Sequence, residues 1–276
     1  MTESKVPYIT LSDGGKIPQL GCGTWTLKED AVDVVKMALA AGCRSIDTAE
    51  LYGNEEFVGK GIRESGIPRE DIFLTTKISP DAMRHPPQKQ WIDESLKKLD
   101  CGYIDLLLIH WSIDDHNKET WETMEEYVDK GLVKHIGVSN FHPHHLDDLL
   151  AYAKIRPVVD QLEIHPYNTQ QSNIKACHDR GVAVECWSPL AQGRVMKDPV
   201  ITKIAEAHKK NNAQITLRWE IQRGLITIPK FRNPVHIQQN MDIFDFELTD
   251  EEMKAITALN ENKRCNPLND PENCPW

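Results

Sequence analysis

The sequence predicts an α/β fold, a (β/α)8 TIM barrel that occupies residues 1–276 as a single domain. Eight short apolar segments alternate with helix-like segments from about Leu20 to about Pro229. Each apolar segment suits a parallel strand that is buried on both faces. The chain of 276 residues also fits one such barrel, which typically needs about 250 residues. Length alone would allow two domains, but no linker-like or low-complexity stretch divides the chain.

The first expected element is a β-hairpin. Tyr8–Leu11 and Lys16–Pro18 flank Ser12-Asp13-Gly14-Gly15, which has the composition of a tight turn. We expect this hairpin to close the bottom of the barrel. The expected barrel strands follow at residues 20–23, 44–47, 72–77, 103–110, 133–139, 158–163, 182–187 and 225–229.

Helices are expected between the strands. Residues 30–41 carry apolar side chains at 31, 34, 35, 38 and 39, which is the spacing of one helix face, and residues 91–99 and 121–128 show similar stripes. The tail from Pro267 reads as irregular, and we expect it to lie over one end of the barrel. Glycines that suit left-handed helix ends precede several strands, at positions 42, 102, 131, 181 and 224.

Bulk composition excludes several classes of function. The net charge of −10 argues against binding to nucleic acid or to membrane surfaces, which relies on clusters of Lys and Arg. The seven cysteines are odd in number and form no CxxC pair, so we interpret most of them as small buried residues in a reducing compartment. The first residues lack the pattern of a signal peptide, and no apolar run approaches ~20 residues. We expect a cytoplasmic protein.

Polar residues follow three successive predicted strands, at the barrel end where chemistry takes place. Asp47 ends the second strand, with Tyr52 in the loop beside it; Lys77 ends the third and His110 the fourth. These four side chains suit hydride transfer to a carbonyl group. A phenol can donate the proton that the oxygen needs, and a nearby ammonium lowers its pKa. The aspartate would hold the lysine, and the histidine would orient the carbonyl.

Each residue alone has a simpler interpretation. Asp47 could cap the next helix, Lys77 could be solvated, and His110 could be structural. Tyr52 could pack against Phe57. Only their joint placement at consecutive strand ends favours catalysis.

Four segments carry a resemblance to a known family. They are Gly42-Cys43-Arg44-Ser45-Ile46-Asp47-Thr48-Ala49-Glu50-Leu51-Tyr52-Gly53-Asn54-Glu55, Thr75-Thr76-Lys77, Leu107-Leu108-Ile109-His110-Trp111 and Gly137-Val138-Ser139-Asn140-Phe141. From about residue 6 to 260 the chain resembles the aldo-keto reductases, and within them the short-loop branch of 2,5-diketo-gluconate reductases and protozoal prostaglandin F synthases. The resemblance implies NADPH-dependent reduction of aldehydes and ketones, with Tyr52 as proton donor and Asp47, Lys77 and His110 completing the catalytic tetrad.

The resemblance also implies a nicotinamide cofactor site without a Rossmann fingerprint, which Gly21-x-Gly23 does not provide. Ser139, Asn140 and Gln161 would bond the carboxamide. Trp187 would stack on the nicotinamide ring, although core packing is an alternative. The residues expected to bind the cofactor are Thr24, Trp25, Asp47, Ser139, Asn140, Gln161, Trp187, Ser188, Leu190, Gln192, Lys230, Phe231, Arg232, His236, Gln239 and Asn240.

The adenosine end departs from the family pattern of Ile-Pro-Lys-Ser, a later Arg, and Glu-Asn. Here Lys230 remains, but Phe231 lacks a hydroxyl group and His236 replaces a permanently charged guanidinium. Arg232 could compensate. We expect NADP(H) to be preferred by a smaller margin than usual, with NAD(H) also used.

No metal is expected. His142-Pro143-His144-His145 reads as a helix start, and His110 and His116 lack a matching carboxylate.

Trp25, Tyr52, His110 and Trp111 would form the mouth of the substrate pocket. The loop at residues 111–117 is short, as in family members with open pockets. We expect small aldehydes, α-dicarbonyls or sugar-derived carbonyls as substrates. Larger ketones of steroid or prostaglandin size stay open, as do the physiological substrate and direction. A monomer is expected.

Two other classes of function are alternatives to a carbonyl reductase. A non-catalytic cofactor-binding subunit, like the potassium-channel β subunits, would carry the same tetrad without turnover. A metal-dependent barrel hydrolase would need an early His-x-His at a strand end, and residues 20–26 contain none.

Overall fold

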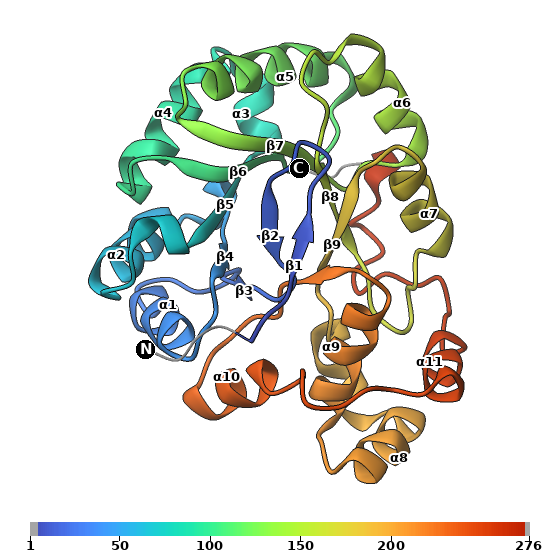
Figure 1. Cartoon of the computed structure of the whole chain (residues 1–276). Coiled ribbons are helices and arrows are strands. Elements are labelled where there is room, and N and C mark those ends of the chain that lie inside the picture. Colours follow the sequence, from blue (N-terminus) through green and yellow to red (C-terminus); the bar gives the residue numbers. More distant parts are fainter. Residues whose placement is uncertain (1–4, 274–276) are drawn as a thin grey trace.

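The computed structural model describes residues 5–273 and shows eight parallel strands in one sheet, in the order β10-β9-β8-β7-β6-β5-β4-β3 (Figure 1). The two outer strands meet, because Leu20 pairs with Thr227 and Gly23 with Lys230 in parallel bridges. The predicted barrel is therefore confirmed. The strands are β3 (Cys22–Gly23), β4 (Ser45–Asp47), β5 (Phe73–Ile78), β6 (Ile104–Ile109), β7 (Val133–Ser139), β8 (Val159–Glu163), β9 (Ala183–Trp187) and β10 (Ile226–Thr227).

Helices surround the strands (Figure 1). The first of them buries residues 31, 34, 35, 38 and 39, the face that the sequence predicts. The five glycines expected at helix ends all have φ between 70° and 97°, which favours glycine. The helices are α1 (Ala31–Ala40), α2 (Glu55–Glu64), α3 (Pro80–Arg84), α4 (Gln88–Leu99), α5 (Asp114–Asp129), α6 (Pro143–Tyr152), α7 (Gln171–Asp179), α8 (Pro199–His208), α9 (Asn212–Gln222), α10 (Pro234–Met241) and α11 (Asp250–Thr257), with short 3-10 turns η1 (Glu50–Tyr52), η2 (Arg69–Asp71), η3 (Ala191–Lys197) and η4 (Pro271–Asn273).

The predicted hairpin is confirmed, and it closes the amino end of the barrel. Strands β1 (Tyr8–Thr10) and β2 (Lys16–Pro18) pair in antiparallel fashion. Ile17 is fully buried and packs in one apolar cluster with Phe73 and Val159, which open two of the barrel strands. The amino end is therefore filled, and the opposite end is left for chemistry.

The largest difference from a predicted boundary is at the start of α5; smaller ones occur elsewhere, and α4 begins three residues before the predicted stripe 91–99. The expected loop at 111–117 includes the first turn of α5. This helix starts at Asp114, seven residues before the predicted helical stripe 121–128. Asp114 and Asp115 suit a helix N-terminus, where the backbone N–H groups carry a partial positive charge. The apolar stripe begins only later, so hydrophobic periodicity missed this polar turn.

The segment from Cys265 onward includes the expected tail from Pro267, and we call it the C-terminal tail. Its described part lies over the carboxyl ends of β7 and β8, as expected for an end of the barrel. The Cys265 backbone N–H donates to Glu163, the last residue of β8, and Glu272 contacts His142, just after β7.

No helix in the described part of the chain is long and apolar enough to cross a bilayer. Its six cysteines are unpaired thiols, of which four are buried and two half-buried, and Cys274 lies outside the described residues.

Candidate active site

The four predicted catalytic residues lie at the carboxyl ends of three adjacent strands. Asp47 ends β4, Lys77 is the next-to-last residue of β5, and His110 directly follows β6. Tyr52 ends the 3-10 turn η1 after β4. The structure brings all four together.

Lys77 and Asp47 form a buried ion pair. The Lys77 Nζ atom lies 2.7 and 2.8 Å from the two carboxylate oxygens of Asp47 and 2.8 Å from the Thr48 carbonyl oxygen. Burial by itself lowers the pKa of Lys77, but Asp47 and Tyr52 outweigh it and the net pKa is raised. Lys77 is 1% exposed, so it is not a solvated lysine, and the N-cap of α2 is Asn54 rather than Asp47. The lysine is a fixed positive charge at neutral pH.

Tyr52 and His110 lie next to this charge. The Lys77 ammonium is 5.1 Å from the centroid of the Tyr52 ring, and the Tyr52 and His110 rings meet edge to face with centroids 5.7 Å apart. Burial raises the pKa of Tyr52 above its ordinary value, and Lys77 pulls it down by less than burial raises it. Lys77 therefore lowers the pKa of Tyr52, as expected, but the net shift of this pKa is upward because burial has the larger effect. The phenol is fully protonated at neutral pH, as a proton donor must be.

His110 is neutral. Burial, and then repulsion from Lys77, hold its pKa well below the usual range. Its Nδ1 atom is buried and has no hydrogen-bond partner among the described residues. A neutral imidazole beside Tyr52 can donate one N–H to a carbonyl oxygen without adding a second positive charge to the site.

Sequence reasoning missed one residue of this network, Glu185. The Gln161 side-chain amide donates to Asp47 Oδ2 at 2.9 Å and to Glu185 Oε2 at 2.6 Å. Burial, and then the charge of Asp47, raise the pKa of Glu185 to about 7. The available signal was an acidic residue inside the apolar segment 182–187, which was counted only as a strand.

The nicotinamide end of the expected cofactor site is ordered by its own hydrogen bonds. Asn140 adopts φ = 60° and donates through Nδ2 to the His110 carbonyl oxygen and to Ser139 Oγ, while the Trp187 indole N–H donates to Asn140 Oδ1 at 3.0 Å. Both amide protons of Gln161 go to carboxylates, so its carbonyl oxygen is the group left to accept from a ligand. These residues fit a carboxamide group. Trp187 is half-buried, with its N–H anchored at this end rather than in the apolar core.

The loop after β9 has an unusual backbone. Ser188 and Gln192, both expected near the pyrophosphate, have φ of 52°, and Ala191 between them has φ of 46°. Leu190 lies in the same loop, directly before η3. Left-handed residues in series can turn several backbone N–H groups toward one side, an arrangement that binds anions.

Residues expected at the adenosine end lie just before α10 and within it, and the basic ones are exposed. Lys230 donates to Thr26 Oγ1 at 2.9 Å, and Arg232 and His236 are exposed. Burial, and then repulsion from Arg232, lower the pKa of Lys230. Phe231 is fully buried in the core, so its side chain offers no contact to a ligand there.

The remaining expected residues differ in exposure. Thr24 is buried and donates to the Asp47 carbonyl oxygen, and Trp111 is 4% exposed, whereas Trp25 is 53% exposed. In α10, Gln239 is half-buried and Asn240 is buried.

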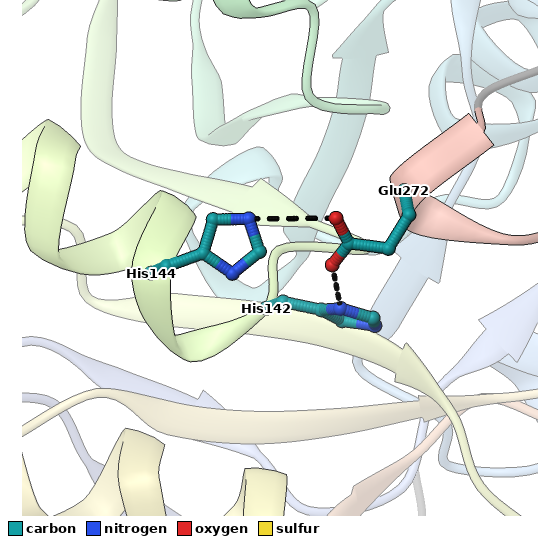
Figure 2. A group of neighbouring side chains, drawn as sticks. All are labelled: His142, His144 and Glu272. Atoms are coloured by element: carbon teal, nitrogen blue, oxygen red, sulfur yellow. Dashed lines mark hydrogen bonds and ion pairs between the residues drawn. The ribbon is translucent and has the colours of Figure 1, made fainter.

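The histidine-rich segment 142–145 starts a helix, as predicted. His142 is the N-cap of α6 and its backbone N–H donates to His145 Nδ1. Figure 2 shows the Glu272 carboxylate between His142 and His144, with one oxygen facing each ring.

The chain is similar to known proteins over most of its length. A family model described as "Aldo/keto reductase family" matches residues 19–261. The chain is 43% identical to a glyoxal reductase of Bacillus subtilis (strain 168), over 97% of this chain and 98% of the relative. It is 42% identical to a 9,11-endoperoxide prostaglandin H2 reductase of Trypanosoma cruzi (strain CL Brener), over 96% and 95%.

Solved structures of related proteins have the same fold. An aldo-keto reductase from a Medee basin deep-sea metagenome library has a TM-score of 0.94 at 39% identity and covers 98% of this chain and 100% of that one. A Bombyx mori aldo-keto reductase in complex with NADP has a TM-score of 0.88 at 37% identity, with both chains covered completely. The chain therefore belongs to the aldo-keto reductase family and is an NAD(P)H-dependent carbonyl reductase.

Proposed function

We propose that the chain reduces small aldehydes and α-dicarbonyls with NADPH, and that Tyr52 gives the proton. The observation that carries this proposal is the buried Lys77 ammonium, which is paired with Asp47 and faces the Tyr52 ring at 5.1 Å. When bound, the reduced nicotinamide supplies the hydride. The chain's own groups must then supply the proton and stabilise the charge on the oxygen.

Each of the four residues has a separate task in this mechanism. Tyr52 is protonated beforehand, because burial raises its pKa. Lys77 stabilises the phenolate that remains once the proton has moved to the carbonyl oxygen, which lowers the barrier to the transfer. Asp47 keeps Lys77 charged and in place, and the neutral His110 donates a hydrogen bond that orients the carbonyl.

The finer cofactor preference rests on the adenosine end. We expect Lys230 to pair with a 2′-phosphate, and His236 is a weaker partner for it than a guanidinium. We propose that NADPH is preferred over NADH by less than about 10³-fold in kcat/KM, which corresponds to about 4 kcal/mol. We also propose the remaining expected cofactor contacts. These are Trp187 at the nicotinamide ring, and Ser188, Leu190 and Gln192 beside the pyrophosphate.

The substrate class follows from the mouth of the barrel. The exposed Trp25 and the Tyr52–His110 pair suit a small carbonyl compound. The relative named glyoxal reductase makes α-dicarbonyls the first candidates.

We also propose that residues 1–276 form one domain and that the protein is a cytoplasmic monomer. Size-exclusion chromatography would test the monomer, and cell fractionation would test the location.

The decisive experiment is NADPH oxidation against a panel of α-dicarbonyls, simple aldehydes and sugars at fixed pH. We expect the highest kcat/KM for α-dicarbonyls. An inactive protein that still binds NADPH would instead support the non-catalytic binding subunit. Turnover that is unchanged after treatment with a metal chelator would support the prediction that the reaction itself needs no metal.

A further inference from the structure

A second group of reactive side chains lies at the carboxyl end of β8, outside the hydrogen-bonded network of the tetrad. Glu163 ends this strand, His165 follows two residues later, and Cys265 comes from the C-terminal tail. The His165 Nε2 atom lies 3.3 Å from Glu163 Oε1 and 3.4 Å from Cys265 Sγ. One donor atom from each residue lies within 4.8 Å of the other two.

These distances match a tetrahedral zinc site. Ligand bonds of about 2.1 Å to nitrogen and oxygen and about 2.3 Å to sulfur give ligand–ligand separations of about 3.4 Å for N···O and about 3.6 Å for N···S. The observed separations of 3.3 and 3.4 Å are close to both values. The three side chains could therefore bind an ion with little movement.

Two of the three side chains in this group are deeply buried. Glu163 and His165 are 0% and 1% exposed. The atoms without a hydrogen-bond partner within residues 5–273, Glu163 Oε2 and His165 Nδ1, lie outside the proposed set of ligand atoms. Cys265 is half-buried.

The charges around the group are mixed. The Arg264 guanidinium lies 3.8 Å from Glu163 Oε2, the oxygen that does not face His165. The negative charges of Glu163 and of a Cys265 thiolate would together neutralise a divalent ion. The Arg264 guanidinium would then leave the group with a net charge of +1, located beside Glu163 Oε2. Cysteine coordinates an ion as the thiolate, so binding requires that the Cys265 thiol gives up its proton.

The cluster in Figure 2 is the alternative place for a cation, and its position is less favourable. His142 and His144 lie at the start of α6, where the helix end carries a partial positive charge. That end attracts the Glu272 carboxylate and repels a metal ion. This cluster contains no sulfur ligand, so the two places can be told apart by spectroscopy.

We propose that Glu163, His165 and Cys265 form a site for Zn²⁺, with three protein ligands and a fourth position for water. Binding releases the Cys265 thiol proton to solvent, and the His165 proton resides on Nδ1 so that Nε2 can coordinate. The ion would fix the C-terminal tail to the end of β8. Glu163 pairs with Trp187 across the sheet, so the site borders the nicotinamide end of the cofactor site.

The test uses Co²⁺ as a spectroscopic probe and the full chain under reducing conditions. We expect a thiolate-to-Co²⁺ charge-transfer band that saturates at one ion per chain and disappears when Zn²⁺ is added. Cys265→Ser should abolish the band. The matched control is Cys101→Ser, which removes another half-buried thiol that bonds backbone carbonyls, and it should keep the band.

Glu272→Gln separates the two clusters and should also leave the band unchanged. Thermal unfolding gives a second readout, because Zn²⁺ should raise Tm in the wild type and in Glu272→Gln but not in Cys265→Ser. The proposal is overturned if Co²⁺ gives no thiolate band, if the band survives in Cys265→Ser, or if Glu272→Gln removes it.

Discussion

The two ends of the expected cofactor site are built differently. At the nicotinamide end, Asp47, Lys77 and Gln161 are at most 2% exposed and are joined by hydrogen bonds of 2.7–2.9 Å. At the adenosine end, Lys230, Arg232 and His236 are exposed. Buried charges act strongly because little solvent screens them, whereas exposed charges are weak partners. The chemistry and the choice of cofactor should therefore respond separately to mutation.

The largest expected effect is that of Tyr52→Phe. Removing the phenol oxygen takes away the proposed proton donor and should lower kcat by about 10²–10⁴-fold. NADPH affinity should stay within about twofold, because no cation at the adenosine end is touched. Stopped-flow reduction and fluorescence titration with NADPH measure the two quantities. A kcat near that of the wild type would remove Tyr52 from the mechanism.

Lys77→Met should reduce kcat by about 10²-fold or more, since the phenolate loses its counter-charge. It also leaves Asp47 buried without a partner, which should lower the free energy of unfolding by about 3–5 kcal/mol. The double variant Asp47→Asn/Lys77→Met should recover most of the stability and none of the activity. Urea unfolding together with steady-state kinetics separates the two effects, and recovered activity would contradict the assigned roles.

Glu185 should make stability depend on pH. Its pKa is raised to about 7, so between about pH 4 and pH 7 the folded state binds more protons than the unfolded state. Stability from this group is therefore lost as pH rises through that window, by up to about 3 kcal/mol. Glu185→Gln should flatten this part of the urea-unfolding pH profile, and exposed Glu247→Gln serves as control. An unchanged profile in Glu185→Gln would show that Glu185 titrates normally.

At the exposed end the expected effects are smaller. Lys230→Ala should raise KM for NADPH by about tenfold, equivalent to about 1.4 kcal/mol, because it removes the proposed charged partner of the 2′-phosphate. KM for NADH and both kcat values should change by less than about twofold. A parallel rise in KM for both cofactors would place Lys230 elsewhere on the dinucleotide.

His236→Arg is the mildest change. A permanent charge at an exposed position should strengthen NADPH preference by about two- to fivefold, or about 0.5–1 kcal/mol. The ratio of kcat/KM for the two cofactors at low and high salt measures it, because screening should erase most of the gain. A salt-independent gain would point to packing instead of charge.

The sequence was sufficient to predict the strands and the convergence of Asp47, Tyr52, Lys77 and His110, because both depend on local patterns. Apolar segments mark strands, and polar residues that directly follow them must meet at one rim of a parallel barrel. Glu185 was missed for the same reason, since a carboxylate within an apolar segment still reads as strand. Its role depends on Gln161, which is 24 residues away in the chain.

Other features depend on contacts that periodicity does not encode. The start of α5 rests on polar side chains of its first turn rather than on an apolar stripe. Phe231 follows an exposed lysine, yet its ring turns into the core. The group at Glu163 and Cys265 joins residues 102 apart, which only the folded tail brings together.

The closure of the barrel has a consequence for synthesis. The Gln19 side chain donates to the Leu225 carbonyl oxygen across a separation of 206 residues, beside the bridge between Leu20 and Thr227. At about 5–20 residues per second, a ribosome needs roughly 10–40 s to make the chain between them. Throughout that time β3 has an open edge that another nascent chain could pair with. Chaperone protection during translation should therefore affect the yield of this protein more than the final stability of its fold.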